Sequence, residues 1–229
     1  CTGLGFVFGK KGGVDRWATL RSASRGGFIG EVRKLPVEDY DLVVNDFEPV
    51  SAWAARLRNV PCIGLSHQAA VLNDMAPQPE VAQRTGMTIL RHYAPSRKAF
   101  GFHFARYDAA TFTPVIRQAV RERPINVYGH CTVYLPAYAD KAILEVLSKC
   151  GGMRWAVFSK YSRSTYTYGN VQVSPVRDDH FVRSMANSEG VLCGAGFETP
   201  AEALYLGKKL MVIPMIGQYE QQCNAAALA

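Results

Sequence analysis

The sequence predicts an α/β protein built from two doubly wound, Rossmann-like halves with a cleft between them. Short apolar runs of strand type alternate with amphipathic stretches of helix type, which is typical of β-α units around parallel sheets. A stretch with Pro114 and several arginines separates two such sets. The chain has 229 residues, of which 48% are hydrophobic, and this is enough for one large domain or two small ones.

The predicted strands are short apolar runs bounded by turn residues. In chain order they are 41–44, 62–65, 99–104, 132–135, 155–158, 171–173, 190–193 and 210–213. The predicted helices are the amphipathic stretches at 14–22, 50–58, 81–92, 138–149, 178–185, 200–206 and 219–228. We expect an N-terminal domain over 1–113, a linker over 114–124 and a C-terminal domain over 125–229.

The composition favours an anionic partner without choosing one. The formal net charge is +7 and the pI is near 9.2, which suits nucleic acid, an anionic membrane or phosphorylated small molecules. No apolar run approaches the ~20 residues of a membrane span, and no signal-peptide pattern opens the chain. The six cysteines form no C-x-x-C pair, so we expect reduced, buried thiols and a cytoplasmic protein.

A glycine-rich turn follows the predicted strand 190–193. Gly194 and Gly196 can bring the backbone close to a ligand. The helix behind them directs N–H groups and the positive end of its dipole to the same point. This turn predicts a site for an anion such as pyrophosphate, and the alternative is a plain strand-turn-helix.

The helix after this turn carries start and stop signals. Thr199 is its predicted N-cap, with Pro200 at the first helical position and Glu202 completing a capping box. Gly207 is the predicted C′ residue. We therefore expect a short helix whose N-terminus faces the glycine turn.

Polar side chains crowd the start of the last predicted helix, 219–228. They are Gln218, Glu220, Gln221, Gln222 and Asn224. Amide and carboxylate groups can bridge sugar hydroxyls, although a surface helix also begins with polar residues. Two neighbouring β-α turns suited to phosphate and polyol groups favour the ligand interpretation.

These two turns carry a resemblance to a known family. The sequence GAGFETPAEALYLGKK at 194–209, followed by P-x-x-G-Q-x-E-Q-x-x-N-A from Pro214, resembles the donor-binding signature of GT-B glycosyltransferases. The likeness is strongest to the lipid-linked N-acetylglucosaminyltransferase of peptidoglycan synthesis. Residues 39–68 and 168–198 are similar to a bacterial and archaeal branch of that superfamily. The resemblance implies the GT-B fold, with an acceptor-side domain followed by a nucleotide-sugar-binding domain.

The resemblance also implies roles for individual residues. Gly194, Gly196 and Thr199 would lie against the donor pyrophosphate, and Glu202 would accept hydrogen bonds from the ribose, in competition with its capping role. The resemblance further implies that Glu220 and Gln221 hold hydroxyls of the transferred sugar, and that Phe197 and the segment 173–176 lie near the nucleobase. Gln218 and Asn224 are donor-binding candidates from the polar cluster at the start of the last helix.

The chain departs from the family in one respect. Members usually begin with a glycine-rich loop that contains a histidine and often holds the catalytic base. The glycine-rich segments at 3–5 and 12–13 lack that histidine. The chain also starts at Cys1 and stops at Ala229 within a helical pattern, so we expect an incomplete N-terminal domain in part of a longer protein.

Three residues at predicted strand ends are candidates for the catalytic base. Asp46 and Glu48 follow the strand 41–44, and His67 follows the strand 62–65. Sugar transfer requires a base beside the acceptor hydroxyl. The alternative is that Asp46 and Glu48 cap the helix that opens at Pro49 and that His67 makes a buried hydrogen bond. We expect no metal, because a helix dipole and basic side chains can neutralise the departing diphosphate.

The sequence therefore predicts a metal-independent hexosyltransferase that moves a sugar from a nucleoside diphosphate, expected to be UDP, to an acceptor hydroxyl. No cofactor is expected, because the nucleotide-sugar is a substrate. A nucleotide-sugar epimerase or hydrolase of the same fold is the alternative. A nucleic-acid-binding module is a weaker one, since only 91–107 combines basic and aromatic residues. That stretch would also suit docking at the inner membrane face to reach a lipid-linked acceptor. The sequence predicts no oligomeric state.

Overall fold

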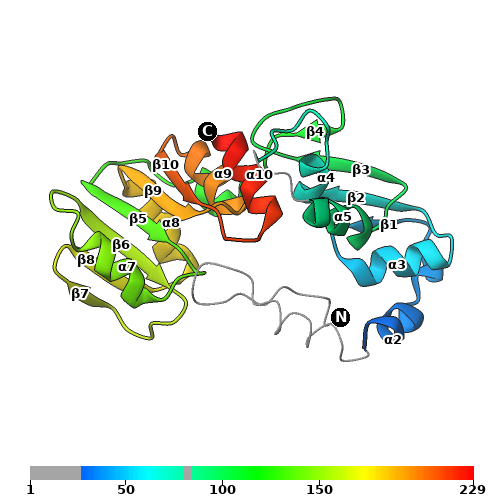
Figure 1. Ribbon diagram of the computed structural model, residues 1–229, viewed down its shortest axis with the longest axis horizontal. Helices are drawn as coiled ribbons and strands as arrows, with labels where there is room; N and C mark the ends of the chain where they lie inside the picture. The colour runs from blue at the N-terminus through cyan, green and yellow to red at the C-terminus, as the bar shows by residue number, and fades with distance from the viewer. Residues whose placement is uncertain (1–26, 80–83) are drawn as a thin grey trace. The chain divides into compact units, whose positions relative to one another are not determined.

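The computed structural model describes residues 27–79 and 84–229, which form two compact units (Figure 1). Unit 1 comprises 27–79, 84–114 and Gly217–Ala229, and unit 2 comprises Val115–Ile216. The predicted helix at 14–22 and the glycine-rich segments at 3–5 and 12–13 lie outside the described residues. None of the helices within the described ranges has the length and apolar character needed to cross a membrane.

Unit 1 contains a parallel sheet of four strands in the order β1-β2-β3-β4. The strands are β1 (Val43–Asn45), β2 (Cys62–Ser66), β3 (Lys98–Phe102) and β4 (Thr111–Phe112). The helices of the unit are α2 (Gly27–Lys34), the 3-10 helix η1 (Val37–Asp39), α3 (Pro49–Leu57), α4 (His67–Val71), α5 (Arg84–Tyr93) and α10 (Tyr219–Leu228). Because every strand is parallel, the carboxyl ends of β1, β2 and β3 meet at one edge.

Helix α10 packs in unit 1, although the sequence assigns residues 217–229 to the second domain. Its Tyr219 and Cys223 form a buried cluster with Val71 of α4 and Leu90 of α5. Gly86 of α5 permits close approach, because a Cβ added there would lie 2.5 Å from the Cβ of Tyr219. This apolar contact explains why α10 belongs to unit 1 and not to the predicted C-terminal domain.

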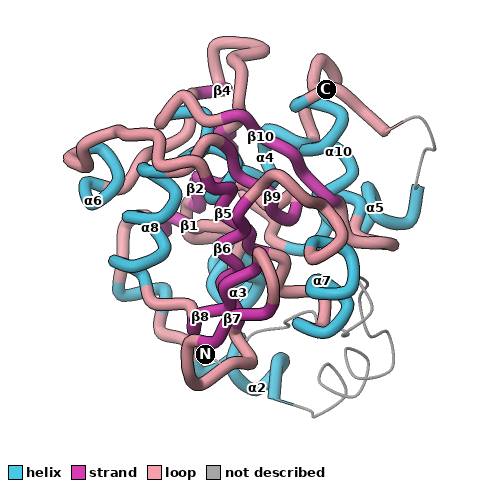
Figure 2. Tube along the Cα trace, turned by 90° about the vertical axis from the view of Figure 1, so that its left-hand side faces the viewer, coloured by secondary structure: helices cyan, strands magenta, loops and turns pink. Residues whose placement is uncertain are grey.

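Unit 2 contains a sheet of six strands in the order β10-β9-β5-β6-β8-β7, parallel except for β7. Figure 2 shows β10, β9, β5 and β6 following one another across this unit. The strands are β5 (His130–Tyr134), β6 (Arg154–Ser159), β7 (Tyr166–Tyr168), β8 (Val171–Pro175), β9 (Gly190–Gly194) and β10 (Lys209–Ile213). The helices are α6 (Gln118–Arg121), α7 (Asp140–Leu147), α8 (Asp178–Asn187) and α9 (Glu198–Tyr205).

Helices cover both faces of this sheet. On one face Val191 and Cys193 of β9 pack with residues of α8 and α9. On the other face Leu192 packs with Ile143 and Leu147 of α7. This is the doubly wound arrangement that the sequence predicts for the unit.

The predicted linker 114–124 is corrected by the structure. From Val115 onward it belongs to unit 2, and Val120 of α6 is fully buried in the cluster that contains Val191 and Cys193. The arginines around it are typical of a connecting segment, whereas Val120 and the partly buried Ile116 pack the segment against the core of unit 2.

The eight predicted strands are all present, each within two residues of its expected bounds. The predicted helices inside the described residues are also present, from α3 to α10. Strands β4 and β7, helices α2, α4 and α6 and the 3-10 helix η1 are additional elements among the described residues.

Candidate donor site and polar centre of unit 1

The candidate donor site lies where the strand order of unit 2 reverses. β5 and β9 are neighbours, and the chain continues from β5 to β6 on one side and from β9 to β10 on the other. Ligands of doubly wound sheets bind outside the carboxyl ends of the strands at such a point. The turn Gly194-Ala195-Gly196 follows β9 directly and therefore lies at this edge.

The backbone of this turn is open on one side. Ala195 is fully buried, whereas a Cβ added to Gly196 would meet no atom within 4 Å. A ligand can thus approach the backbone at Gly196. Val176, 38% exposed, lies just beyond the carboxyl end of β8 at the same edge. Val173 of the segment predicted near the nucleobase is fully buried in the core.

The N-terminus of α9 differs from the prediction. The helix begins at Glu198 with Phe197 as its N-cap residue, and no side chain within the described ranges caps it. Thr199 is therefore inside the first turn, and Glu202 completes no capping box. The first helical hydrogen bond runs from Ala201 N–H to Phe197 O, so the amides of Glu198 and Thr199 precede the intrahelical ladder.

The C-terminus of α9 matches the prediction. Gly207 has φ +63°. Its N–H donates to Leu204 O at 3.0 Å, and the N–H of Lys208 donates to Ala203 O at 3.0 Å. These two bonds form a Schellman motif, so α9 is pinned at its far end and uncapped at the end that faces the glycine turn.

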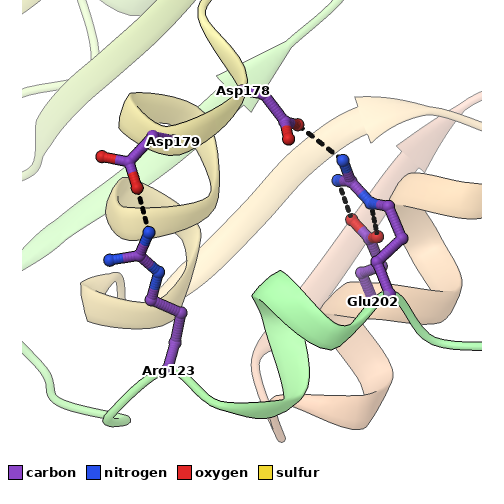
Figure 3. A network of polar contacts seen from close by, with 5 residues as sticks. Arg123, Asp178, Asp179 and Glu202 are labelled. Carbon is purple, nitrogen blue, oxygen red and sulfur yellow. Dashed lines mark hydrogen bonds and ion pairs between the residues drawn. The ribbon is translucent and has the colours of Figure 1, made fainter.

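The carboxylate of Glu202 accepts hydrogen bonds from Arg117, a residue of the predicted linker 114–124 (Figure 3). Arg117 donates from Nε to Oε1 of Glu202 at 2.6 Å and from Nη2 to Oε2 at 3.0 Å. Its Nη1 donates to Oδ1 of Asp178 at 2.5 Å. The hydrogen bonds to Glu202 and then to Asp178 raise the pKa of Arg117 above its ordinary value.

The other predicted donor residues, Gln218, Glu220, Gln221 and Asn224, lie at or within α10 in unit 1. The predicted donor-binding residues therefore divide between the two units. The amide oxygen of Gln218 is buried and has no hydrogen-bond partner among the described residues. Buried polar atoms usually have a partner, so this oxygen is a position where a ligand hydroxyl or amide could donate.

His67 forms a buried polar centre in unit 1. Its Nδ1 donates to Phe102 O at 2.8 Å, and its Nε2 lies 2.7 Å from Oδ1 of Asn224. Oε1 of Glu220 lies 4.0 Å from the same Nε2, and Gln68 Nε2 donates to Oε2 of Glu220 at 3.2 Å. Of the two interpretations that the sequence left open for His67, the structure shows the buried hydrogen bond.

His103 completes this centre and was missed by the sequence analysis. It follows β3 directly, its ring centroid lies 5.1 Å from that of His67, and its Nδ1 lies 3.0 Å from the hydroxyl oxygen of Tyr107. Burial, and then the nearby His67, lower the pKa of His103 from 6.5 to about 4. The rule that identified Asp46 and His67 selects polar residues after predicted strands, and it did not find His103 because the predicted strand 99–104 runs past this residue.

Glu48 is the N-cap of α3. Its carboxylate accepts from the N–H groups of Val50 at 2.8 Å and Ser51 at 2.7 Å, and from the Ser51 hydroxyl at 2.7 Å. Asp46 is exposed at the carboxyl end of β1. The capping alternative therefore holds for Glu48.

A separate cavity of about 510 Å³ lies elsewhere in unit 2. Its walls include Arg154 of β6, Gln172 of β8 and Ser184 of α8. Of the segment 173–176 expected near the nucleobase, Ser174 also lines it. At the candidate donor site, backbone groups of the glycine turn are available to hold a ligand.

Several solved structures are similar to this chain in fold. MurG of Acinetobacter baumannii is 17% identical and has a TM-score of 0.52, over 92% of this chain and 63% of that one. LpCGTa in complex with UDP is 13% identical with a TM-score of 0.56, over 93% and 65%. Phytolacca americana UGT2, complexed with UDP-2fluoro-glucose and pterostilbene, is 13% identical with a TM-score of 0.53, over 92% and 64%.

The chain thus spans less than two thirds of the length of these three structures. The likeness confirms the predicted GT-B type of α/β fold. The sequence matches no curated protein. Residues 28–229 match the family described as glycosyl transferase family 1, and the chain belongs to that family.

Proposed function

We propose that this chain binds a nucleoside diphosphate sugar, with UDP as the carrier, and transfers the hexose to an acceptor hydroxyl. The observation that carries the proposal is the uncapped N-terminus of α9 behind the open glycine turn, at the reversal of the strand order. Amides of Glu198 and Thr199 and the helix dipole suit a diphosphate there. Two of the similar structures were determined with UDP or a UDP-sugar, which supports this choice of donor.

In the proposed reaction, the acceptor oxygen bonds to the anomeric carbon while the bond from that carbon to the diphosphate oxygen breaks. The diphosphate leaves with the electron pair, and the helix dipole stabilises its charge without a metal. The acceptor proton passes to a base. Asp46 is our candidate, because its carboxylate is exposed, whereas the carboxylate of Glu48 and the imidazole ring of His67 already make hydrogen bonds.

The donor site is tested by filling the open side of the turn. Gly196→Ala adds a Cβ that meets nothing within 4 Å, so the variant should fold while its methyl group obstructs the diphosphate. Gly151→Ala is the matched control, since its Cβ also meets no atom within 4 Å. We expect UDP to raise the melting temperature of the wild type and of Gly151→Ala, but not of Gly196→Ala. Equal UDP shifts in all three proteins would refute the site.

The reaction is tested with a labelled UDP-hexose. Label recovered in an acceptor product supports transfer, whereas label recovered as free sugar or as an epimer of the donor would contradict it. Asp46→Asn should lower kcat and leave the UDP-induced melting shift unchanged.

The acceptor is proposed to be lipid-linked at an anionic membrane surface. Exposed basic side chains of unit 1 lie at the end of α5 and before, within and after β3, namely Arg91, Arg97, Lys98 and Arg106. Basic side chains are attracted to anionic lipid. Co-sedimentation with anionic vesicles but not with neutral ones would support this, and equal recovery with both would reject it.

A further inference from the structure

Arg117 engages two carboxylates through three different nitrogens. Nε and Nη2 hold the two oxygens of Glu202, and Nη1 holds Asp178 (Figure 3). The Glu202 side chain is only 5% exposed, whereas that of Arg117 is 46% exposed. The planar guanidinium therefore fixes the plane of a nearly buried carboxylate, a geometry that a lysine cannot supply.

The pairing leaves Glu202 able to accept further hydrogen bonds. An ionised carboxylate has about four lone-pair sites, and Arg117 uses one on each oxygen. Asp178, at the first residue of α8, holds the guanidinium from its opposite end. Glu202 is thus presented in one fixed orientation before any ligand arrives, and such preorganisation reduces the cost of binding.

We propose that Arg117 is a positioning residue, which orients Glu202 toward the ribose hydroxyls of the nucleoside diphosphate. This inference rests on the proposed function, together with the ribose-binding role that the family resemblance implies for Glu202. Arg117 acts through Glu202 and not on the diphosphate. Its loss should therefore weaken recognition of the hydroxyls and leave recognition of the phosphates intact.

The test compares three ligands by calorimetry on the full chain: UDP, 2′,3′-dideoxyuridine diphosphate and inorganic pyrophosphate. We expect the wild type to bind UDP with a Kd about tenfold lower than that of the dideoxy analogue, which corresponds to roughly 1.4 kcal/mol. Arg117→Ala and Glu202→Gln should each reduce that preference to less than about threefold, with the affinity for the other two ligands unchanged. Arg117→Lys should retain an intermediate preference, and the double variant should lose no more than either single one.

Arg123 provides a matched control. It pairs with Asp179, the residue after Asp178 in α8 (Figure 3), and has no hydrogen bond to Glu202 among the described residues. Arg123→Ala removes an equivalent arginine-aspartate contact, so a general loosening of α8 would appear in it as well. We expect it to keep the full preference for UDP.

Two results would overturn the inference. If Arg117→Ala weakened all three ligands by one factor, Arg117 would be a diphosphate ligand. If the preference for UDP survived in both Arg117 variants while Glu202→Gln lost it, Glu202 would need no positioning. A wild type that binds neither UDP nor pyrophosphate would instead refute the proposed function itself.

Discussion

Nε2 of His67 lies 2.7 Å from the side-chain oxygen of Asn224, across 157 residues of sequence. Both side chains are buried, His67 to 6% exposure and Asn224 to 0%. The contact ties α10 to the carboxyl end of β2. Asn224, predicted from sequence as a donor ligand, thus has a structural partner within unit 1.

Asn224→Ala is expected to loosen α10. The change leaves a buried ring nitrogen without its partner, which costs about 1–3 kcal/mol. Urea unfolding and amide exchange over residues 219–228 measure the loss. In a double-mutant cycle, His67→Phe combined with Asn224→Ala should cost less than the sum of the single changes. Strictly additive losses would show that the two side chains do not interact.

Glu48 is expected to contribute stability and not catalysis. Glu48→Ala removes the acceptor for two backbone N–H groups at the start of α3, so the free energy of unfolding should fall by about 1 kcal/mol. Glu48→Gln keeps an oxygen acceptor and should lose less. Transfer assays well below the melting temperature should give the same kcat for both variants and the wild type. A stable Glu48→Gln protein with a greatly reduced kcat would restore Glu48 as a catalytic candidate.

His103 should make unit 1 less stable in acid. Burial, and then His67, lower its pKa from 6.5 to about 4, so below pH 6.5 the unfolded chain takes up a proton that the folded chain does not. This contribution is complete above pH 6.5 and is lost as the pH falls toward 4, at up to about 1.4 kcal/mol per pH unit.

The measurement is the urea midpoint between pH 8 and pH 4.5. His103→Gln should show a shallower loss in acid than the wild type. Tyr107→Phe removes the hydroxyl 3.0 Å from Nδ1 but keeps the imidazole, and it should retain the steep dependence. Identical slopes for His103→Gln and the wild type would contradict the assignment.

The strands could be predicted because each corresponds to a short apolar run that is visible locally in the sequence. The run 190–193 is apolar on both faces and is buried on both sides of its sheet. β7 was missed for the same reason, since Tyr166, Thr167 and Tyr168 are all exposed at a sheet edge and carry no apolar alternation.

What the sequence could not supply are the pairings between distant residues. No local sequence pattern distinguishes a helix that covers its own sheet from one that packs on another unit. Helix α10 belongs to unit 1 because its Tyr219 and Cys223 pack there. Glu202 reads as a capping residue from its spacing alone. Its partner Arg117 is 85 residues away, in a stretch whose charge resembled a linker.

At Gly101 of β3, the strand lies close against helix α4 of unit 1. A Cβ added there would lie 2.5 Å from both the Cβ and the backbone nitrogen of Ala70 in α4. Gly101→Ala should therefore destabilise the protein by about 1–3 kcal/mol through overpacking. Gly30→Ala is the matched control, because a Cβ within α2 meets nothing within 4 Å there, and it should raise stability by about 0.5–1 kcal/mol.

A further variant, Ala70→Gly, distinguishes the side-chain contact at Gly101 from the backbone contact. Ala70→Gly removes one colliding methyl group but leaves the backbone nitrogen of residue 70 in place. Combined with Gly101→Ala, it should restore little of the lost stability in urea unfolding. If the double variant regained the full free energy of unfolding of the wild type, only the two methyl groups would collide. Helix α4 could then pack against β3 with an alanine at position 101.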